Sequence, residues 1–232
     1  MIPASLRAIV FDVDGTLYRQ GPVRLAMFVR LIQAHFRRPL AGLRTLRWLQ
    51  AYRKAQERLR HEPPNGNDLA DRQLLLASEW TGVPPWVLRS YVHRWMEQEP
   101  LDLLQPYLRD GLPELLGAAA GRSLRVGACS DYPASEKLTA MGIAGSFQAV
   151  VSAQDAEVQR FKPHPRILEI ALRRLGVHRE EALYVGDRPE VDAETARQAG
   201  VACAIIARRP RFNPTPGCLY LTSLRQLLDI IH

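Results

Sequence analysis

Two aspartates directly after an apolar segment are the residues whose types and spacing most clearly suit chemistry. Asp12 and Asp14 follow the apolar run 8–11, and Gly15 comes next. Side chains two residues apart in a strand project to the same side, so both carboxylates should point one way where a strand ends. Such close carboxylates repel each other, and a metal ion, a shared proton or an electrophile would justify the pair. An aspartate can also be a nucleophile that passes through an aspartyl-phosphate. The alternative is a plain strand-end turn, in which Asp and Gly are common.

A hydroxyl and a further carboxylate follow a second apolar run. Ser130 and Asp131 come directly after residues 124–129. Turn N–H groups at this point would suit phosphate oxygens. The competing interpretation is that these two residues only cap the helix expected near residue 135.

A lysine and two more aspartates complete the candidate set. Lys162 stands before two prolines, and only three of the 31 basic residues are lysines, the others being Lys54 and Lys137. In so arginine-rich a chain, a retained lysine indicates a need for a compact point charge, although a solvated loop lysine is the alternative. Asp187 ends another apolar run, and Asp192 falls at the start of the next expected helix. Helix capping explains Asp192 but not Asp187.

The charge of this set predicts a metal ion. The members are Asp12, Asp14, Lys162, Asp187 and Asp192. Four carboxylates and one ammonium carry about −3, so a phosphate dianion cannot be accepted as well unless a cation is bound. The set offers oxygen ligands and no His or Cys cluster, which makes Mg²⁺ the expected ion, ahead of Mn²⁺ or Ca²⁺.

The elements that must position these residues alternate along the second half of the chain. The expected strands are residues 8–11, 124–129, 149–152, 183–185, 201–206 and 219–221, and the expected helices are 135–141, 165–175, 191–199 and 224–231. Strands that alternate with helices predict an α/β fold, a doubly wound parallel sheet with a Rossmann-like core. Ligands of such sheets bind beyond the carboxyl ends of the strands, where the candidate residues lie.

An all-helical block interrupts this alternation. Apolar residues at three- and four-residue spacing predict helices over 23–36, 40–59, 69–81 and 85–97, with no convincing strand among them. We therefore expect a catalytic core of residues 1–17 and 106–232 and a helical cap domain of residues 18–105. Because the cap is inserted directly after the first strand, it should act as a lid over the site.

Basic residues are concentrated in the cap. Between Arg19 and Glu62 there are eleven Arg and Lys against two Glu, a balance of +9 that exceeds the +7 of the whole chain. A positive field of this kind favours anionic partners: small phosphorylated molecules, nucleic acid or an anionic membrane surface.

The remaining composition indicates the expected compartment. No apolar run approaches the ~18 residues of a membrane span, and the first expected strand begins too early for a signal peptide. Cys129, Cys203 and Cys218 are odd in number, lack metal-binding spacing and lie in apolar segments. They are expected to be buried thiols in a reducing environment, and the expected location is the cytoplasm.

The candidate segments, in this order, resemble the four motifs of the haloacid dehalogenase-like hydrolase superfamily. The motifs are D-x-D-G-T-L at residues 12–17, the strand-end Ser130, the lysine of K-P-x-P at Lys162, and G-D-x-x-x-x-D at residues 186–192. The resemblance spans residues 6–206. The inserted helices resemble the C1 cap of the phosphoglycolate phosphatase-like branch.

The resemblance implies the roles in catalysis. Asp12 would be the nucleophile that forms the aspartyl-phosphate, and Asp14 the acid that protonates the leaving alcohol and then activates water. Ser130, Asp131 and Lys162 would hold the phosphoryl oxygens, and Lys162 would also offset the charge of Asp12. Asp131 departs from the family pattern, since many members have Asn or another neutral residue there. Its side chain could point away so that only its backbone N–H donates to the phosphate, and the role of the side chain stays open.

The resemblance also implies a metal site. Mg²⁺ would be coordinated by Asp12, by Asp14 through its main-chain carbonyl, and by Asp187. Asp192 would support these ligands without binding the ion.

The main interpretation is a phosphatase that acts on a small phosphorylated metabolite. Dehalogenases of the superfamily lack the acid two residues after the nucleophile, so Asp14 argues against halide displacement. A phosphosugar mutase would share the core motifs but retain the phosphate. In a third interpretation the basic cap docks on nucleic acid or acidic lipid and catalysis is secondary. This third interpretation is the least expected, because arginines on the wet face of an amphipathic helix are usually just solvated, and nucleic acid is not an expected partner.

Overall fold

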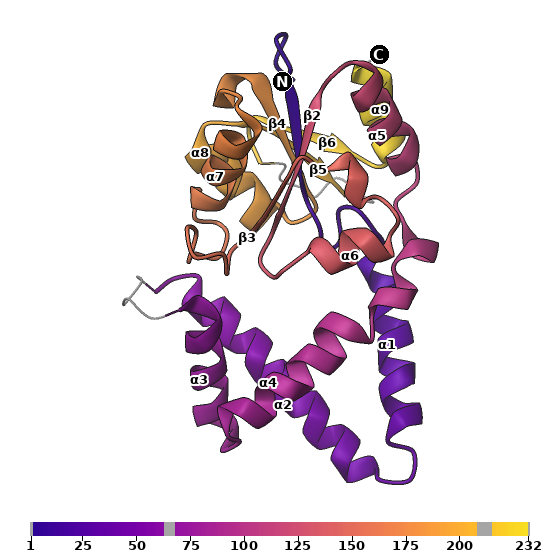
Figure 1. The fold of residues 1–232 in the computed structure, drawn as a ribbon, viewed down its shortest axis with the longest axis vertical. Coiled ribbons are helices and arrows are strands. Elements are labelled where there is room, and N and C mark those ends of the chain that lie inside the picture. The colour runs from indigo at the N-terminus through magenta and orange to yellow at the C-terminus, as the bar shows by residue number, and fades with distance from the viewer. Residues whose placement is uncertain (1, 63–67, 208–214, 232) are drawn as a thin grey trace.

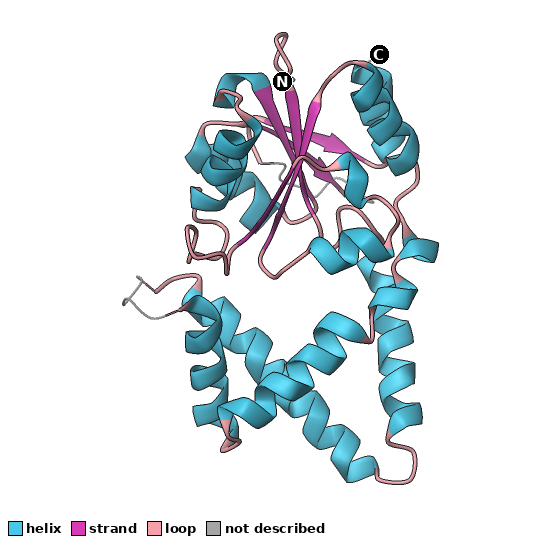
Figure 2. Cartoon of the chain, viewed as in Figure 1, coloured by secondary structure: helices cyan, strands magenta, loops and turns pink. Residues whose placement is uncertain are grey.

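Six parallel strands form the centre of the molecule. The computed structural model describes residues 2–62, 68–207 and 215–231. The strands run in the order β3-β2-β1-β4-β5-β6, and each pairs in parallel with its neighbour (Figures 1 and 2). Their bounds are β1 Ala8–Asp12, β2 Arg125–Ser130, β3 Ala149–Ser152, β4 Ala182–Gly186, β5 Ala202–Ile206 and β6 Cys218–Leu221. The order reverses between β1 and β4, which confirms the predicted doubly wound sheet and places a ligand site at that point.

Helices cover both faces of the sheet because the central strand is apolar on both sides. All five residues of β1 are buried, and successive side chains point to opposite faces. Ala8 and Val10 join one apolar cluster with α7 and α8, and Ile9 and Phe11 join the other with α5, α6 and α9 (Figure 1). The helix bounds are α5 Leu112–Gly121, α6 Ser135–Ala140, α7 Arg166–Leu175, α8 Glu194–Ala199 and α9 Leu224–Ile231. The helix α5 was not among the predicted elements.

The inserted segment is helical, as predicted, and lies beyond the carboxyl ends of the strands (Figure 1). Its elements are α1 Gln20–Ala34, α2 Pro39–Leu59, α3 Leu69–Thr81, α4 Pro85–Val92 and the π-helical turn His93–Gln98. The helices α2, α3 and α4 pack around an apolar cluster of their own, which includes Trp48, Tyr52 and Leu88. None of the helices in the described part of the chain combines the length and apolarity that a membrane crossing requires.

Two short segments join this helical block to the sheet and run side by side. The strand-like bridge Tyr18–Leu108 pairs them, and Arg19 and Arg109 donate backbone N–H groups to Tyr107 and Leu17. The 3₁₀ turns Leu101–Leu103 and Gln105–Tyr107 precede the bridge on the return path. The domain boundaries at residues 17/18 and 105/106 remain predictions.

The three cysteines lie on or next to the sheet. Cys129 and Cys203 are buried and Cys218 is partly buried. Burial raises the pKa of the Cys129 thiol. Cys129 and Cys203 are therefore packing residues of the core, as expected, whereas Cys218 is less buried than expected.

Candidate active site

Asp12 ends β1 and is held by two donors. The Lys162 ammonium donates to Asp12 Oδ1 at 2.5 Å, and the Thr16 hydroxyl donates to Oδ2 at 2.9 Å. Only 5% of Asp12 is exposed, and burial raises its pKa well above the usual value although Lys162 opposes the shift. Asp12 is thus a buried, oriented carboxylate whose charge depends on a neighbouring cation.

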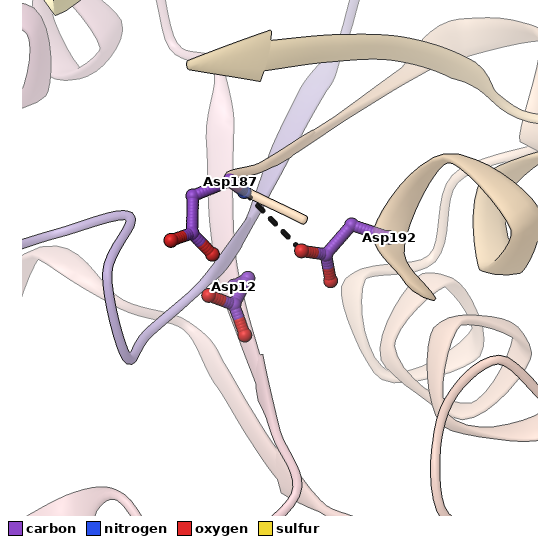
Figure 3. A group of neighbouring side chains, drawn as sticks. All are labelled: Asp12, Asp187 and Asp192. Atoms are coloured by element: carbon purple, nitrogen blue, oxygen red, sulfur yellow. Dashed lines mark hydrogen bonds between the residues drawn. The ribbon is translucent and has the colours of Figure 1, made fainter. Parts of the chain in front are cut away.

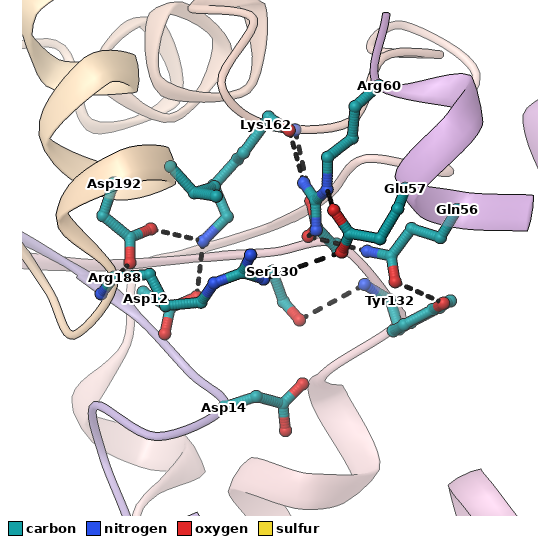
Figure 4. Close-up of polar contacts among 12 residues, drawn as sticks. Asp12, Asp14, Gln56, Glu57, Arg60, Ser130, Tyr132, Lys162, Arg188 and Asp192 are labelled. Carbon is teal, nitrogen blue, oxygen red and sulfur yellow. Dashed lines mark hydrogen bonds and ion pairs between the residues drawn. The ribbon is translucent and has the colours of Figure 1, made fainter. Parts of the chain in front are cut away.

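Lys162 links two of the predicted acidic residues. Its ammonium donates to Asp12 and to Asp192 Oδ1 at 2.7 Å (Figure 4). It also donates to the Tyr184 hydroxyl at 3.3 Å. Burial disfavours the ammonium, but Asp12 and Asp192 outweigh it and raise the pKa of Lys162 well above the usual value. The lysine is a compact internal charge, and the solvated-loop alternative does not apply.

Asp14 lies in the turn after β1, with a different set of partners. Lys137 donates to its two carboxylate oxygens at 2.7 and 2.8 Å, and the Tyr18 hydroxyl donates to Oδ1 at 2.5 Å. Burial raises the pKa of Asp14, but Lys137 and Tyr18 outweigh it, so the pKa is lower than usual. In this state Asp14 is a carboxylate that can accept a proton.

Asp192 orients the loop that follows β4. It lies in the π-helical turn Pro189–Ala193, where its Oδ2 accepts the backbone N–H of Asp187 at 3.2 Å and of Arg188 at 3.0 Å. A Cβ at Gly186 would lie 2.4 Å from the Cβ of Asp192, so only glycine allows this approach. With Oδ1 already bonded to Lys162 and Tyr184, Asp192 is well placed to hold other groups in position.

Asp187 has a buried oxygen without a partner. Its Oδ1 accepts no hydrogen bond from the described residues, and burial, followed by repulsion from Asp192, raises its pKa to about 6. The backbone of Gly15, at φ +101°, passes so close that a Cβ there would lie 2.2 Å from Asp187 Oδ2. An unpaired buried carboxylate is costly unless a cation compensates it.

Three of the aspartates could share such a cation. Ligand oxygens of Asp12, Asp187 and Asp192 all lie within 4.8 Å of one another (Figure 3). The donor set is oxygen only, which suits a hard divalent ion such as Mg²⁺. Together with the unpartnered Asp187 oxygen, this set fits a metal site. The predicted set had Asp14 in place of Asp192, through its main-chain carbonyl.

Ser130 and Asp131 follow the end of β2. Ser130 comes directly after Cys129, the register partner of Asp12, and its hydroxyl accepts the backbone N–H of Tyr132 at 3.3 Å. The Asp131 carboxylate bonds both to the helical block and to the loop that carries Lys162, since its Oδ2 accepts from Gln56 at 2.8 Å and its Oδ1 accepts the backbone N–H of Lys162 at 3.2 Å. Binding of a phosphate by Ser130 and Asp131 remains a prediction.

A cavity of about 670 Å³ opens above these residues. Its core side is lined by Asp12, Asp14, Lys137 and Lys162, and its other side by residues of α1, α2, α4 and the turn His93–Gln98. This volume suits a small-molecule ligand. The predicted catalytic pair thus lies on the floor of a ligand-sized cavity roofed by the inserted helices.

Comparison with known proteins identifies this arrangement. The sequence pattern of haloacid dehalogenase-like hydrolases matches residues 6–200 of the chain. The chain belongs to this hydrolase family. It is 31% identical to the glyceraldehyde 3-phosphate phosphatase of Methanopyrus kandleri over 97% of both chains. It is 28% identical to the phosphoglycolate phosphatase of Escherichia coli K12 over 84% of this chain and 79% of that one.

Solved structures of the family share the fold. The HAD-hydrolase YfnB of Bacillus subtilis aligns with a TM-score of 0.69 at 16% identity, over 97% of this chain and 98% of that one. The L-2-haloacid dehalogenase RSc1362 aligns with a TM-score of 0.67 at 21% identity, over 98% and 99%. The predicted superfamily, the α/β fold and the class of phosphoric monoester hydrolase are confirmed by these comparisons. The assignment to the C1-capped branch and the roles of single residues remain predictions.

Several contacts of this hydrolase were not predicted from the sequence. Lys137 is the most important, because it contacts Asp14 directly. The scarcity of lysine that singled out Lys162 applies equally to Lys137, so a usable signal was present. Arg60 also reaches the site, through Asp131, but 28 of the 31 basic residues are arginines and nothing distinguishes this one.

Proposed function

We propose that this hydrolase is a Mg²⁺-dependent phosphatase that releases phosphate from a small phosphomonoester through an aspartyl-phosphate on Asp12. The observation that carries the proposal is the buried Asp12, paired with Lys162 beside the unpartnered Asp187 oxygen on the floor of the cavity. Phosphoryl transfer requires positioning and charge neutralisation, and this arrangement supplies both. The phosphatase names of the curated relatives support the same reaction.

In the proposed first step Asp12 attacks phosphorus in line with the leaving oxygen. The bond to that oxygen breaks as the aspartyl-phosphate forms, and Asp14 gives a proton to the departing alcohol. In the second step water attacks the phosphorus, Asp14 takes its proton, and the bond to Asp12 breaks. Lys162 offsets the negative charge beside Asp12, and Ser130 with the backbone of Asp131 orients the phosphoryl oxygens.

The proposed metal site uses Asp12, Asp187 and the main-chain carbonyl of Asp14. When bound there, Mg²⁺ would neutralise charge on the phosphoryl group. Asp192 fixes the Asp187 loop through the two backbone N–H groups that it accepts.

Lys137 adds a condition to the role of Asp14. The lysine holds Asp14 as a carboxylate, which is the form that activates water in the second step. The first step needs the protonated form. We infer that the contact between Lys137 and Asp14 breaks before the leaving alcohol is protonated.

The lining of the cavity supports a substrate with a second anionic group. Arg24 of α1 and Arg53 of α2 both line the cavity, and neither forms a hydrogen bond or ion pair with another described residue. Burial and then repulsion from Arg53 lower the pKa of Arg24, so the two cations in the cavity lining repel each other. A carboxylate on the substrate would relieve this repulsion. The relatives named for phosphoglycolate support a substrate of this class.

Phosphate release from a panel of phosphomonoesters tests the proposed function. We expect purified protein to hydrolyse p-nitrophenyl phosphate and some carboxylated phosphomonoesters with Mg²⁺ and to lose this activity in EDTA. Release that continues unchanged in EDTA contradicts the metal requirement. Isomerised sugar phosphate without free phosphate would instead indicate a mutase.

Asp187→Ala should weaken activation by Mg²⁺. The half-activating Mg²⁺ concentration is expected to rise by about tenfold or more, because losing even indirect support of a metal site costs this much. Titration of phosphate release with Mg²⁺ measures the change, and Asp229→Ala, which removes an exposed carboxylate, is the control. An unchanged Mg²⁺ dependence rules out Asp187 as a ligand.

Arg24→Ala and Arg53→Ala should lower activity only toward carboxylated substrates. We expect kcat/KM for 3-phosphoglycerate to fall by about tenfold or more, the effect of one lost charge-assisted hydrogen bond, with little change for p-nitrophenyl phosphate. Arg47→Ala removes an exposed arginine of α2 that does not line the cavity and serves as the control. Equal losses for both substrates would contradict a subsite for the second anion.

A further inference from the structure

Asp131, the residue that departs from the family pattern, connects the helical block to the catalytic loop. Its Oδ2 accepts from Arg60 Nη2 at 2.7 Å and from Gln56 Nε2 at 2.8 Å, both on or next to α2. Its Oδ1 accepts the backbone N–H of Lys162 at 3.2 Å. One carboxylate therefore binds residues on both sides of the cavity.

Arg60 completes the connection from the other side. Its side chain is only 3% exposed, and its Nη1 donates to the main-chain carbonyl of Lys162. Its Nε donates to Glu57 at 3.0 Å, and its guanidinium lies 5.9 Å from the centre of the Phe161 ring. The N–H and the C=O of Lys162 are thus both held, by two residues that are paired with each other.

We propose that Arg60 and Asp131 are positioning residues that set Lys162 against Asp12 when the helical block is closed over the core. This inference rests on the proposed function, because Lys162 matters there as the cation beside the nucleophile. Moving the helical block away withdraws Arg60, which removes the donor to the Lys162 carbonyl and leaves the Asp131 carboxylate without its main partner. Full activity is then confined to the closed state, in which water is also excluded. The departure at Asp131 follows from the same pairing, since a neutral residue would leave the buried guanidinium with only the exposed Glu57 as a charged partner.

Kinetics of Arg60→Met, Asp131→Asn and the double variant test this proposal. We expect kcat for p-nitrophenyl phosphate to fall by about 10- to 100-fold in each single variant with KM little changed, a typical cost of losing indirect support at a site. The double variant should be no worse than the worse single one, because both act through one contact. Arg60→Lys should restore part of kcat. Arg58→Met, which removes an exposed arginine whose one ion pair among the described residues is with Glu62, is the control.

Hydrogen exchange gives a readout that does not depend on turnover. Peptides covering residues 159–165 should exchange faster in Arg60→Met than in Arg58→Met, because the Lys162 backbone has lost a partner. If Arg60→Met does not fold, the double variant, which leaves no unpaired carboxylate, takes its place. An unchanged kcat in an active protein overturns the proposal, as does a loss confined to KM or unchanged exchange. A wild-type protein that releases no phosphate contradicts the proposed function alone.

A different observation concerns the far end of the helical block. The turn that joins α1 to α2, with the residues around it, lies furthest from the sheet (Figure 1). Its apolar side chains are exposed, Phe36 by 81% and Leu40 by 79%, and the exposed stripe continues along α1. We call this surface the hairpin tip; its apolar residues are Leu25, Val29, Ile32, Phe36, Leu40 and Leu43.

The hairpin tip is also strongly basic. From Gln20 to Gln56 the chain has eight basic residues and no Asp or Glu. Four exposed arginines lie in the turn and in the first half of α2, and none forms an ion pair with another described residue: Arg37, Arg38, Arg44 and Arg47. A second copy of the chain would bring like charges together here. Nucleic acid would engage the arginines but leave six large apolar side chains in water.

We propose that the hairpin tip docks on the surface of an anionic lipid bilayer. Apolar side chains together with arginines are the features with which amphipathic helices enter the headgroup region, where each basic residue contributes about 1 kcal/mol. None of the six apolar residues of the hairpin tip lines the cavity. Docking would hold the enzyme at a membrane without a membrane-spanning segment.

Cosedimentation with vesicles tests the docking. We expect binding to vesicles of phosphatidylcholine mixed with phosphatidylglycerol, weak binding to phosphatidylcholine alone, and release by salt. Phe36→Ser with Leu40→Ser, and separately Arg37→Glu with Arg38→Glu, should each weaken binding by about tenfold or more. Trp86→Ser, which removes a side chain 75% exposed on α4, is the control and should bind normally.

Three outcomes overturn the docking proposal. The first is no binding to the mixed vesicles. The second is binding to duplex DNA with vesicle binding absent. The third is a dimer in solution that the serine variants dissociate, without vesicle binding. Each can be obtained whether or not the protein is a phosphatase.

Discussion

Asp12→Asn should abolish phosphate release while the protein stays folded. The amide is isosteric with the carboxylate, so packing at the end of β1 is kept and the contacts to Thr16 and Lys162 are the only ones changed. An amide cannot form the acyl-phosphate, and removal of a nucleophile that acts as part of a unit costs about 10⁴-fold or more in kcat. Release of phosphate from p-nitrophenyl phosphate measures the loss.

The controls separate loss of chemistry from loss of structure. Asp229→Asn makes the same chemical change at an exposed position and should leave kcat unaltered. Circular dichroism and thermal unfolding should show that Asp12→Asn remains folded. Turnover at the wild-type rate in this variant would eliminate Asp12 as the nucleophile, whatever the metal content of the protein.

The parts of the site that sequence predicts are those that the chain brings together by local structure and by sheet topology. Asp12 lies at the end of an apolar run, and Asp187 follows another, so one parallel sheet places both at the same edge. The six strands follow from apolar runs, each within two residues of its predicted bounds. Patterns of this kind depend on nearest neighbours, which a single sequence contains in full.

The contacts that sequence does not predict join segments whose relative placement depends on the whole fold. Lys137 meets Asp14 across 123 residues, and Arg60 meets Asp131 across 71. The direction of the Asp131 side chain depends on the position of α2. No local sequence pattern predicts that position. The predicted helix over 85–97 is likewise interrupted by a π-helical turn from His93, because apolar spacing does not define which carbonyl each N–H meets.

Asp14→Asn should separate the two steps of the reaction. The amide can neither protonate a leaving alcohol nor accept a proton from water, so steady-state phosphate release is expected to fall by about 10²- to 10⁴-fold. The nitrophenolate of p-nitrophenyl phosphate leaves without a proton, so Asp12 should still be phosphorylated with this substrate. Without Asp14 as the base, water attacks the aspartyl-phosphate slowly in the second step, so this intermediate should accumulate.

Rapid mixing tests this expectation. Asp14→Asn should release a burst of nitrophenolate that matches the concentration of active sites, and then turn over slowly. An alkyl phosphate, whose leaving group needs a proton, should give no burst. Mass spectrometry should find the phosphoryl group on the peptide that contains Asp12. If Asp14→Asn loses activity equally toward both substrates and gives no burst, Asp14 has another role, such as holding Lys137 in place.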